Sequence, residues 1–125
     1  MKLPLLLIAF GSLGVLTRFY LDQNIAPTSG GFPLSTFIIN ILGSLVIGIL
    51  FVLVRERGLI ENEMGVALMV GLLGGFTTFS AFSLQVFQLL DQKKISVALS
   101  YMLLSPFLCV LAAAAGIFGA RLFLK

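Results

Sequence analysis

The sequence GLLGGFTTFSAFS, from Gly71 to Ser83, lies near the centre of the third of four apolar segments in this chain. Two adjacent glycines, Gly74 and Gly75, are followed closely by the β-branched residues Thr77 and Thr78, and this combination weakens helix propensity at one point. The threonine hydroxyls also compete for backbone hydrogen bonds. The pattern predicts a helix that is interrupted here. The alternative is a kinked but continuous helix that packs on a neighbour through the two glycines.

The composition around this stretch is that of a membrane protein. The chain has 125 residues, of which 59% are hydrophobic and only 10% are charged, whereas soluble domains carry roughly 25% charged residues. The charges leave long apolar stretches, and a helix needs about 20 residues to cross a bilayer. The unbroken apolar runs do not fit the short alternating strands of a β-barrel. We therefore expect an all-α membrane protein with a single domain over residues 1–125. Its four transmembrane helices are expected over about residues 3–20, 34–54, 64–90 and 95–123.

The chain lacks the residues on which many functions depend. It has no histidine, and Cys109 is its one cysteine, which excludes a Cys/His metal cluster, a disulfide framework and a Cys/His catalytic dyad. We therefore do not expect an enzyme. The net charge of +3 comes from short connections, which leave too little surface for a nucleic-acid module. The start of the chain has the charged and apolar regions of a signal peptide but no evident cleavage site, so we expect a retained first helix.

The basic residues give only a weak orientation signal. With four spans, one side of the membrane receives five basic residues, and the other receives three. The first group is Lys2, Arg55, Arg57, Arg121 and Lys125; the second is Arg18, Lys93 and Lys94. Orientation follows the excess of basic residues in short loops, and a small excess permits insertion in both directions. The pattern is compatible with an antiparallel homodimer and equally with a single orientation that places both termini inside.

Two lines of polar side chains run through apolar helices. Thr36 and Asn40 begin the first line, which Ser44 continues at the same four-residue spacing, and Tyr101 and Ser105 form the second, which reaches Cys109. An amide such as that of Asn40 costs several kcal/mol in hydrocarbon unless it has a partner. Either a permeating species or a neighbouring helix can supply that partner. For any single hydroxyl, a bond to the carbonyl four residues earlier is the simpler explanation.

The polar groups inside the expected spans are uncharged donors. No Asp or Glu lies there, although cation channels and proton-coupled exporters generally rely on such acids. Neutral donors suit an anion, and the electropositive ring edges of the aromatic stripe Phe76, Phe79 and Phe82 can face one. Core packing or lipid contact is the alternative role of this stripe. Arg18, at the end of the first helix, can attract anions to a vestibule or extend toward lipid headgroups.

Three segments together resemble the Fluc or CrcB family of small bacterial fluoride channels. They are GGFTTFSAFS at 74–83, TFIINILGS at 36–44 and GSLGVLTRF at 11–19. The resemblance implies a fluoride-selective channel that passively exports fluoride from the cytoplasm across the bacterial plasma (inner) membrane and relieves fluoride toxicity. It also implies a dual-topology antiparallel homodimer with two pores.

The resemblance further implies the roles of individual residues. A structural sodium ion, Na+, at the dimer centre would be held by the backbone carbonyls of Gly74 and Thr77. The implied pore and fluoride-binding residues are Thr36, Asn40, Phe79, Phe82, Ser83, Tyr101 and Ser105.

Two other functions remain as alternatives. A small multidrug or guanidinium exporter would generally need a glutamate in the membrane, and the first helix has none. A non-transporting membrane subunit would use the polar line that begins at Thr36 to hold helices together.

Overall fold

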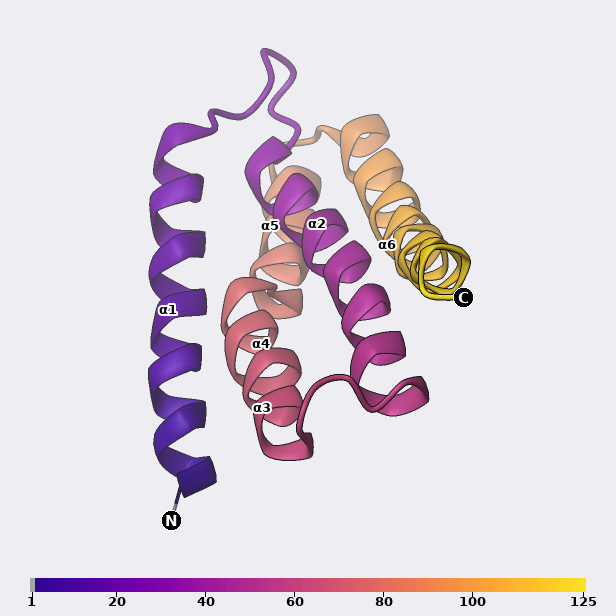
Figure 1. Cartoon of the computed structure of the whole chain (residues 1–125). Coiled ribbons are helices and arrows are strands. Elements are labelled where there is room, and N and C mark those ends of the chain that lie inside the picture. The colour runs from indigo at the N-terminus through magenta and orange to yellow at the C-terminus, as the bar shows by residue number, and fades with distance from the viewer. Residues whose placement is uncertain (1) are drawn as a thin grey trace.

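Four long apolar helical segments make up the chain in the computed structural model, which describes residues 2–125 (Figure 1). All four are long and apolar enough to cross a membrane, and no strand occurs within the described residues. This confirms the predicted all-helical architecture with four membrane-spanning segments. The elements are α1 (Lys2–Asn24), α2 (Leu34–Phe51), the π-helical η1 (Val52–Glu56), α3 (Asn62–Val66), the π-helical η2 (Ala67–Leu72), α4 (Leu73–Phe76), α5 (Phe79–Asp91) and α6 (Ile95–Phe123).

Several helix ends differ from the predicted ones. The first helix continues to Asn24, beyond its expected end at Tyr20, and the Asn24 side-chain Nδ2 donates to the Tyr20 carbonyl of the last turn at 2.7 Å. Asp22, which was expected in the loop, lies in α1 and accepts a hydrogen bond from Ser35 Oγ of α2 at 2.6 Å. The second helix continues as η1 to Glu56.

Glycines bring α1 against the third membrane-spanning segment, Asn62–Asp91, which comprises α3, η2, α4 and α5 and is called the third segment. A Cβ on Gly14 would collide with the carbonyl oxygen of Leu72 in η2, and a Cβ on Gly75 in α4 would meet the backbone of Gly11. The two backbones therefore touch directly, which side chains larger than hydrogen would prevent. This contact runs along one face of α1 and ends near the point where α4 ends.

A second glycine contact joins α2 to α6. Gly48 of α2 faces the carbonyl of Ala113, and Gly116 of α6 faces the carbonyl of Leu45, so each helix contributes a glycine at the crossing. The very short turn at residues 91–94 predicts that the last two helices are antiparallel neighbours. α5 and α6 are in contact, and α6 packs more extensively against α2. In Figure 1, α1 and α6 lie on opposite sides, with α2 and the third segment between them.

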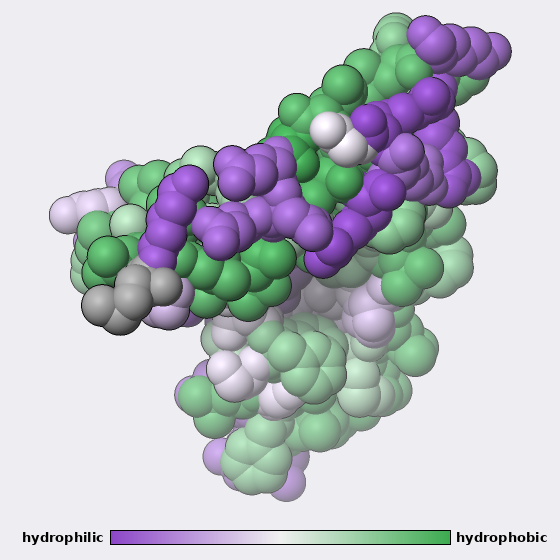
Figure 2. All heavy atoms as spheres, turned by 60° about the horizontal axis from the view of Figure 1, so that its bottom comes forward, coloured by the Kyte–Doolittle hydropathy of each residue, from purple (hydrophilic) through white to green (hydrophobic). Residues whose placement is uncertain are grey.

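Charged side chains gather at the end of the molecule that η1 and α3 form (Figure 2). Exposed residues there include Arg55, Arg57 and Glu61, and Arg121 of α6 pairs with Glu56, its Nε donating to Oε2 at 3.0 Å. Large apolar side chains point outward from all four segments, as a lipid or protein environment requires.

Candidate functional site

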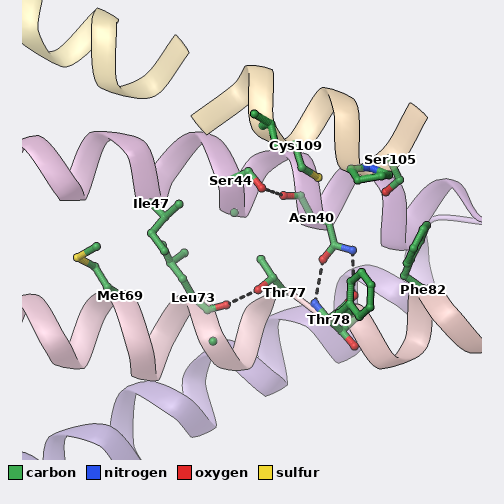
Figure 3. Close-up of a pocket in the computed structure, with 15 residues that line it drawn as sticks. Asn40, Ser44, Ile47, Met69, Leu73, Thr77, Thr78, Phe82, Ser105 and Cys109 are labelled. Atoms are coloured by element: carbon green, nitrogen blue, oxygen red, sulfur yellow. Dashed lines mark hydrogen bonds between the residues drawn. The ribbon is translucent and has the colours of Figure 1, made fainter. Parts of the chain in front are cut away.

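A cavity of about 410 Å³ opens between α2, the third segment and α6. It lies beside the junction of α4 and α5 (Figure 3). The lining residues are Asn40, Gly43, Ser44, Ile47, Met69, Leu73, Gly74, Thr77, Thr78, Phe79, Phe82, Ser105, Pro106, Cys109 and Val110. None of these residues carries a charge, so the polar groups of the cavity are amide, hydroxyl, thiol and backbone groups.

Two residues in extended conformation separate α4 from α5. Helix α4 ends at Phe76; Thr77 has φ −86° and ψ 160°, and Thr78 has φ −153° and ψ 123°. Both threonine hydroxyls act locally: Thr77 Oγ1 donates to the Leu73 carbonyl at 2.8 Å, and Thr78 Oγ1 accepts from the Ala81 amide at 3.2 Å and caps α5. We call Thr77 and Thr78 the interruption.

Asn40 of α2 binds the interruption at two points. Its Oδ1 accepts from the Thr78 amide at 2.8 Å, and its Nδ2 donates to the Thr78 carbonyl at 3.0 Å. Because the first bond needs an oxygen and the second an N–H, the two bonds fix which way the carboxamide points. Nδ2 carries a second hydrogen, and Asn40 lines the cavity. The two bonds to Thr78 therefore orient the remaining N–H donor of Asn40 at the cavity wall.

The backbone carbonyls near the interruption divide into two sets. The Gly75 carbonyl accepts from Arg18 Nε of α1 at 3.1 Å, and the Thr78 carbonyl accepts from Asn40. Among residues 2–125, the Gly74 and Thr77 carbonyls accept no hydrogen bond from a side chain or from a backbone amide outside the helices. These two oxygens remain available to a ligand. The space beside Gly74 is open, because a Cβ on this residue would meet nothing within 4 Å.

The aromatic rings form a series from the cavity into the core. Phe79 is 75% exposed in the protomer, whereas Phe82 is buried, and their ring centroids lie 5.4 Å apart. Phe82 then contacts Tyr101 of α6, with 4.9 Å between centroids, and Phe32 of the first loop packs edge-on against Tyr101 at 5.2 Å. Within this series of rings, Phe79 is therefore the one that a single protomer leaves exposed.

Gln85 links two of the predicted polar residues, although the sequence analysis did not single it out. Its Nε2 donates to Thr36 Oγ1 at 2.8 Å, and its Oε1 accepts from the Tyr101 hydroxyl at 2.8 Å. Thr36 and Tyr101 are buried. Since Thr36 accepts from Gln85, its own hydroxyl hydrogen stays available as a donor. Gln85 carried the same signal as Asn40, an amide in an apolar segment. Gln88, three residues later, carries that signal too, so the signal could have marked Gln85 as a candidate but could not single it out.

The cavity brings together six of the predicted site residues and leaves out four. Those that line it are Asn40, Gly74, Thr77, Phe79, Phe82 and Ser105. Thr36 and Tyr101 lie in the hydrogen-bonded chain through Gln85, and Arg18 contacts Gly75 from the α1 side. Ser83 is exposed, and its hydroxyl donates to the Phe79 carbonyl at 2.9 Å in its own helix.

Comparison with known proteins assigns the chain to a family. The family model described as "CrcB-like protein, Camphor Resistance (CrcB)" matches residues 5–117. The chain belongs to the CrcB family. Membership in this family and the four apolar helices make the chain a multi-pass membrane protein, and the predicted family resemblance is confirmed.

Individual relatives of this CrcB-family chain are named as fluoride-specific ion channels FluC. The protein of Magnetococcus marinus is 40% identical over 113 residues, which cover 90% of this chain and 92% of the relative. That of Hahella chejuensis is 38% identical over 115 residues, with 91% of each chain covered. That of Geotalea uraniireducens is 34% identical over 122 residues, covering 97% of this chain and 98% of the relative.

Proposed function

We propose that this chain is a fluoride-specific ion channel that passively exports fluoride across the bacterial plasma membrane. The name shared by its relatives supports the substrate, and the cavity supports the mechanism. The observation that carries the proposal is the oriented Asn40 amide, which faces a cavity lined by hydroxyls and aromatic rings without any carboxylate. Such a wall offers donors to a small anion and no negative charge to repel it.

The pore residues have separable roles in this proposal. Asn40 and Ser105 supply donors in the cavity, while Phe79 and Phe82 present ring edges that replace water around the anion. The chain of Thr36, Gln85 and Tyr101 continues the polar path on the far side of Phe82. The predicted role of Ser83 in the pore remains part of the proposal. For Arg18, attraction of anions to a vestibule and a structural bond to the Gly75 carbonyl are competing roles.

We further propose that two copies assemble as an antiparallel dual-topology homodimer with two pores. The weak excess of basic residues on one side permits insertion in both directions. A single copy also leaves Phe79 75% exposed beside the cavity. A partner copy would cover this ring and complete the wall, so that the interruptions lie at membrane depth within protein rather than against lipid.

The Gly74 and Thr77 carbonyls fit a sodium ion at the dimer centre. Among residues 2–125, both oxygens lack a side-chain donor and a backbone donor outside the helices, and backbone carbonyls are hard oxygen ligands that bind such ions in broken membrane helices. No group of three or more His, Cys, Asp or Glu residues offers a metal site in the described part of the chain. When bound, the ion would supply positive charge that holds the two interruptions together.

Flux from liposomes tests the channel. Vesicles that contain the purified protein and are loaded with potassium fluoride should release fluoride rapidly when valinomycin carries the potassium counter-ion. The same vesicles loaded with potassium chloride should retain chloride. A fluoride electrode measures the rate. Exchange of guanidinium or organic cations for protons would support the exporter, and protein that forms folded dimers without any flux would support the non-transporting subunit.

A further inference from the structure

Arg18 makes its hydrogen bond within the protein, at the end of α4. Its Nε donates to the Gly75 carbonyl at 3.1 Å, and the side chain is half-buried. We infer that Arg18 is a positioning residue whose Nε–H replaces the backbone donor that α4 loses at the interruption. The inference rests on the proposed function for its flux readout, whereas its stability readout is independent of that function.

The Gly75 carbonyl needs such a donor because α4 ends at Phe76, three residues before the residue whose amide would normally donate to it. In a continuous α-helix, the amide of Phe79 would donate to Gly75. The extended backbone of Thr77 and Thr78 carries Phe79 away, and α5 starts afresh there. Water can satisfy such a carbonyl in a soluble protein, but lipid offers no donor within a bilayer. For Gly75, Arg18 supplies the donor from the protein.

The glycines of α1 place Arg18 where this partner is needed. Gly11, Gly14 and Arg18 recur at intervals of three and four residues, so they share one face of α1. Gly14 touches the Leu72 carbonyl, and Gly11 touches Gly75, so this face lies directly on the third segment. One turn beyond Gly14, the same face reaches the end of α4. The close packing of α1 on the third segment therefore places the Arg18 side chain within hydrogen-bond distance of the Gly75 carbonyl.

Because the donor atom of Arg18 is Nε, a substitution can keep this donor and remove the charge. Arg18 donates through Nε, the nitrogen attached to Cδ, rather than through a terminal guanidinium nitrogen. Glutamine also carries a nitrogen on Cδ, so Arg18→Gln keeps a donor at the corresponding atom and removes the charge. Arg18→Met has a similar length but offers neither donor nor charge. The two neutral variants differ mainly in the hydrogen bond.

The experiment compares these two variants in flux and in thermal unfolding. Fluoride efflux per folded dimer is measured at low and high ionic strength, and the unfolding midpoint is measured in detergent. We expect Arg18→Gln to conduct within about threefold of the wild-type rate, and Arg18→Met to lose about tenfold or more at both ionic strengths. Arg18→Met should also unfold at a lower temperature than Arg18→Gln. Thr17→Ala is the matched control, because the exposed Thr17 bonds only the Leu13 carbonyl in its own helix.

In a protein that conducts fluoride, two outcomes would overturn the inference. Equal losses in both neutral variants that shrink as ionic strength rises, with equal unfolding midpoints, would assign Arg18 to anion attraction. Wild-type behaviour of both variants would leave Arg18 as a headgroup contact. If the wild type does not conduct fluoride, the proposed function fails, and the midpoints decide alone: a lower midpoint for Arg18→Met supports positioning, and equal midpoints refute it.

Discussion

At the scale of single residues, Asn40 has a structural role and a role in the proposed permeation path. Its carboxamide uses one donor and its acceptor on Thr78 and keeps a second N–H beside the cavity. An exposed asparagine would not be fixed in this way, because nothing would prevent its amide from turning. The interruption and the polar wall of the cavity therefore depend on the same side chain.

Asn40→Asp should abolish fluoride flux while the folded dimer remains. The carboxylate would face the Thr78 carbonyl without a hydrogen to share, and it would place negative charge in the path of an anion. We expect the efflux rate from liposomes to fall by about a hundredfold or more. Asn24→Asp makes the same chemical change at an exposed residue and should conduct normally. Unchanged flux in Asn40→Asp would remove Asn40 from the pore.

Gln85→Leu should destabilise the protein by leaving two buried hydroxyls without their partner. Thr36 and Tyr101 each bond to Gln85 and are buried, and a buried polar group that loses its partner costs about 1–3 kcal/mol. A lower thermal unfolding midpoint in detergent measures this cost. Gln88→Leu replaces the exposed glutamine three residues further along α5 and should have a smaller effect. Equal midpoints for the two variants would contradict a structural role for the hydrogen-bonded chain.

At the scale of elements, glycines decide which helices touch. The crossing of α2 and α6 depends on Gly48 and Gly116, each of which faces a backbone carbonyl of the other helix. A carbonyl on a helix backbone cannot rotate away as a side chain can. The fold therefore tolerates no added volume at this crossing.

Gly116→Ala should lower the unfolding midpoint because its methyl group would collide with the Leu45 carbonyl. Overpacking of this kind costs about 1–3 kcal/mol. Gly119→Ala, one turn later in α6, is the matched control because its Cβ would meet nothing within 4 Å. Thermal unfolding of both variants in detergent provides the measurement. The packing argument fails if Gly119→Ala is destabilised as much as Gly116→Ala.

At the scale of the whole molecule, the proposed dual topology has a direct test. Ser29 lies exposed in the connection between α1 and α2 and offers a site for a reporter cysteine. In a Cys109→Ala background, a membrane-impermeant maleimide added outside intact cells should label about half of the Ser29→Cys protein, because a weak charge bias permits both orientations. Labelling of all or none of the protein would indicate one orientation and contradict the antiparallel dimer.

The sequence alone determined the membrane class, the four helical segments and the family resemblance. These properties depend on local quantities: apolar length, the distribution of charges, and motifs such as the segment from Gly74 to Ser83. The same local reasoning identified Asn40 as costly in hydrocarbon. It could not say that the partner of Asn40 would be the backbone of Thr78.

The tertiary structure decided how these residues meet. Thr36, Gln85 and Tyr101 are far apart in sequence, and only the packing of α2, α5 and α6 brings them into one hydrogen-bonded chain. The bond from Arg18 to Gly75 depends in the same way on the close contact between α1 and α4. Helical periodicity fixes the face on which a side chain lies, but the group it meets depends on how the helices cross.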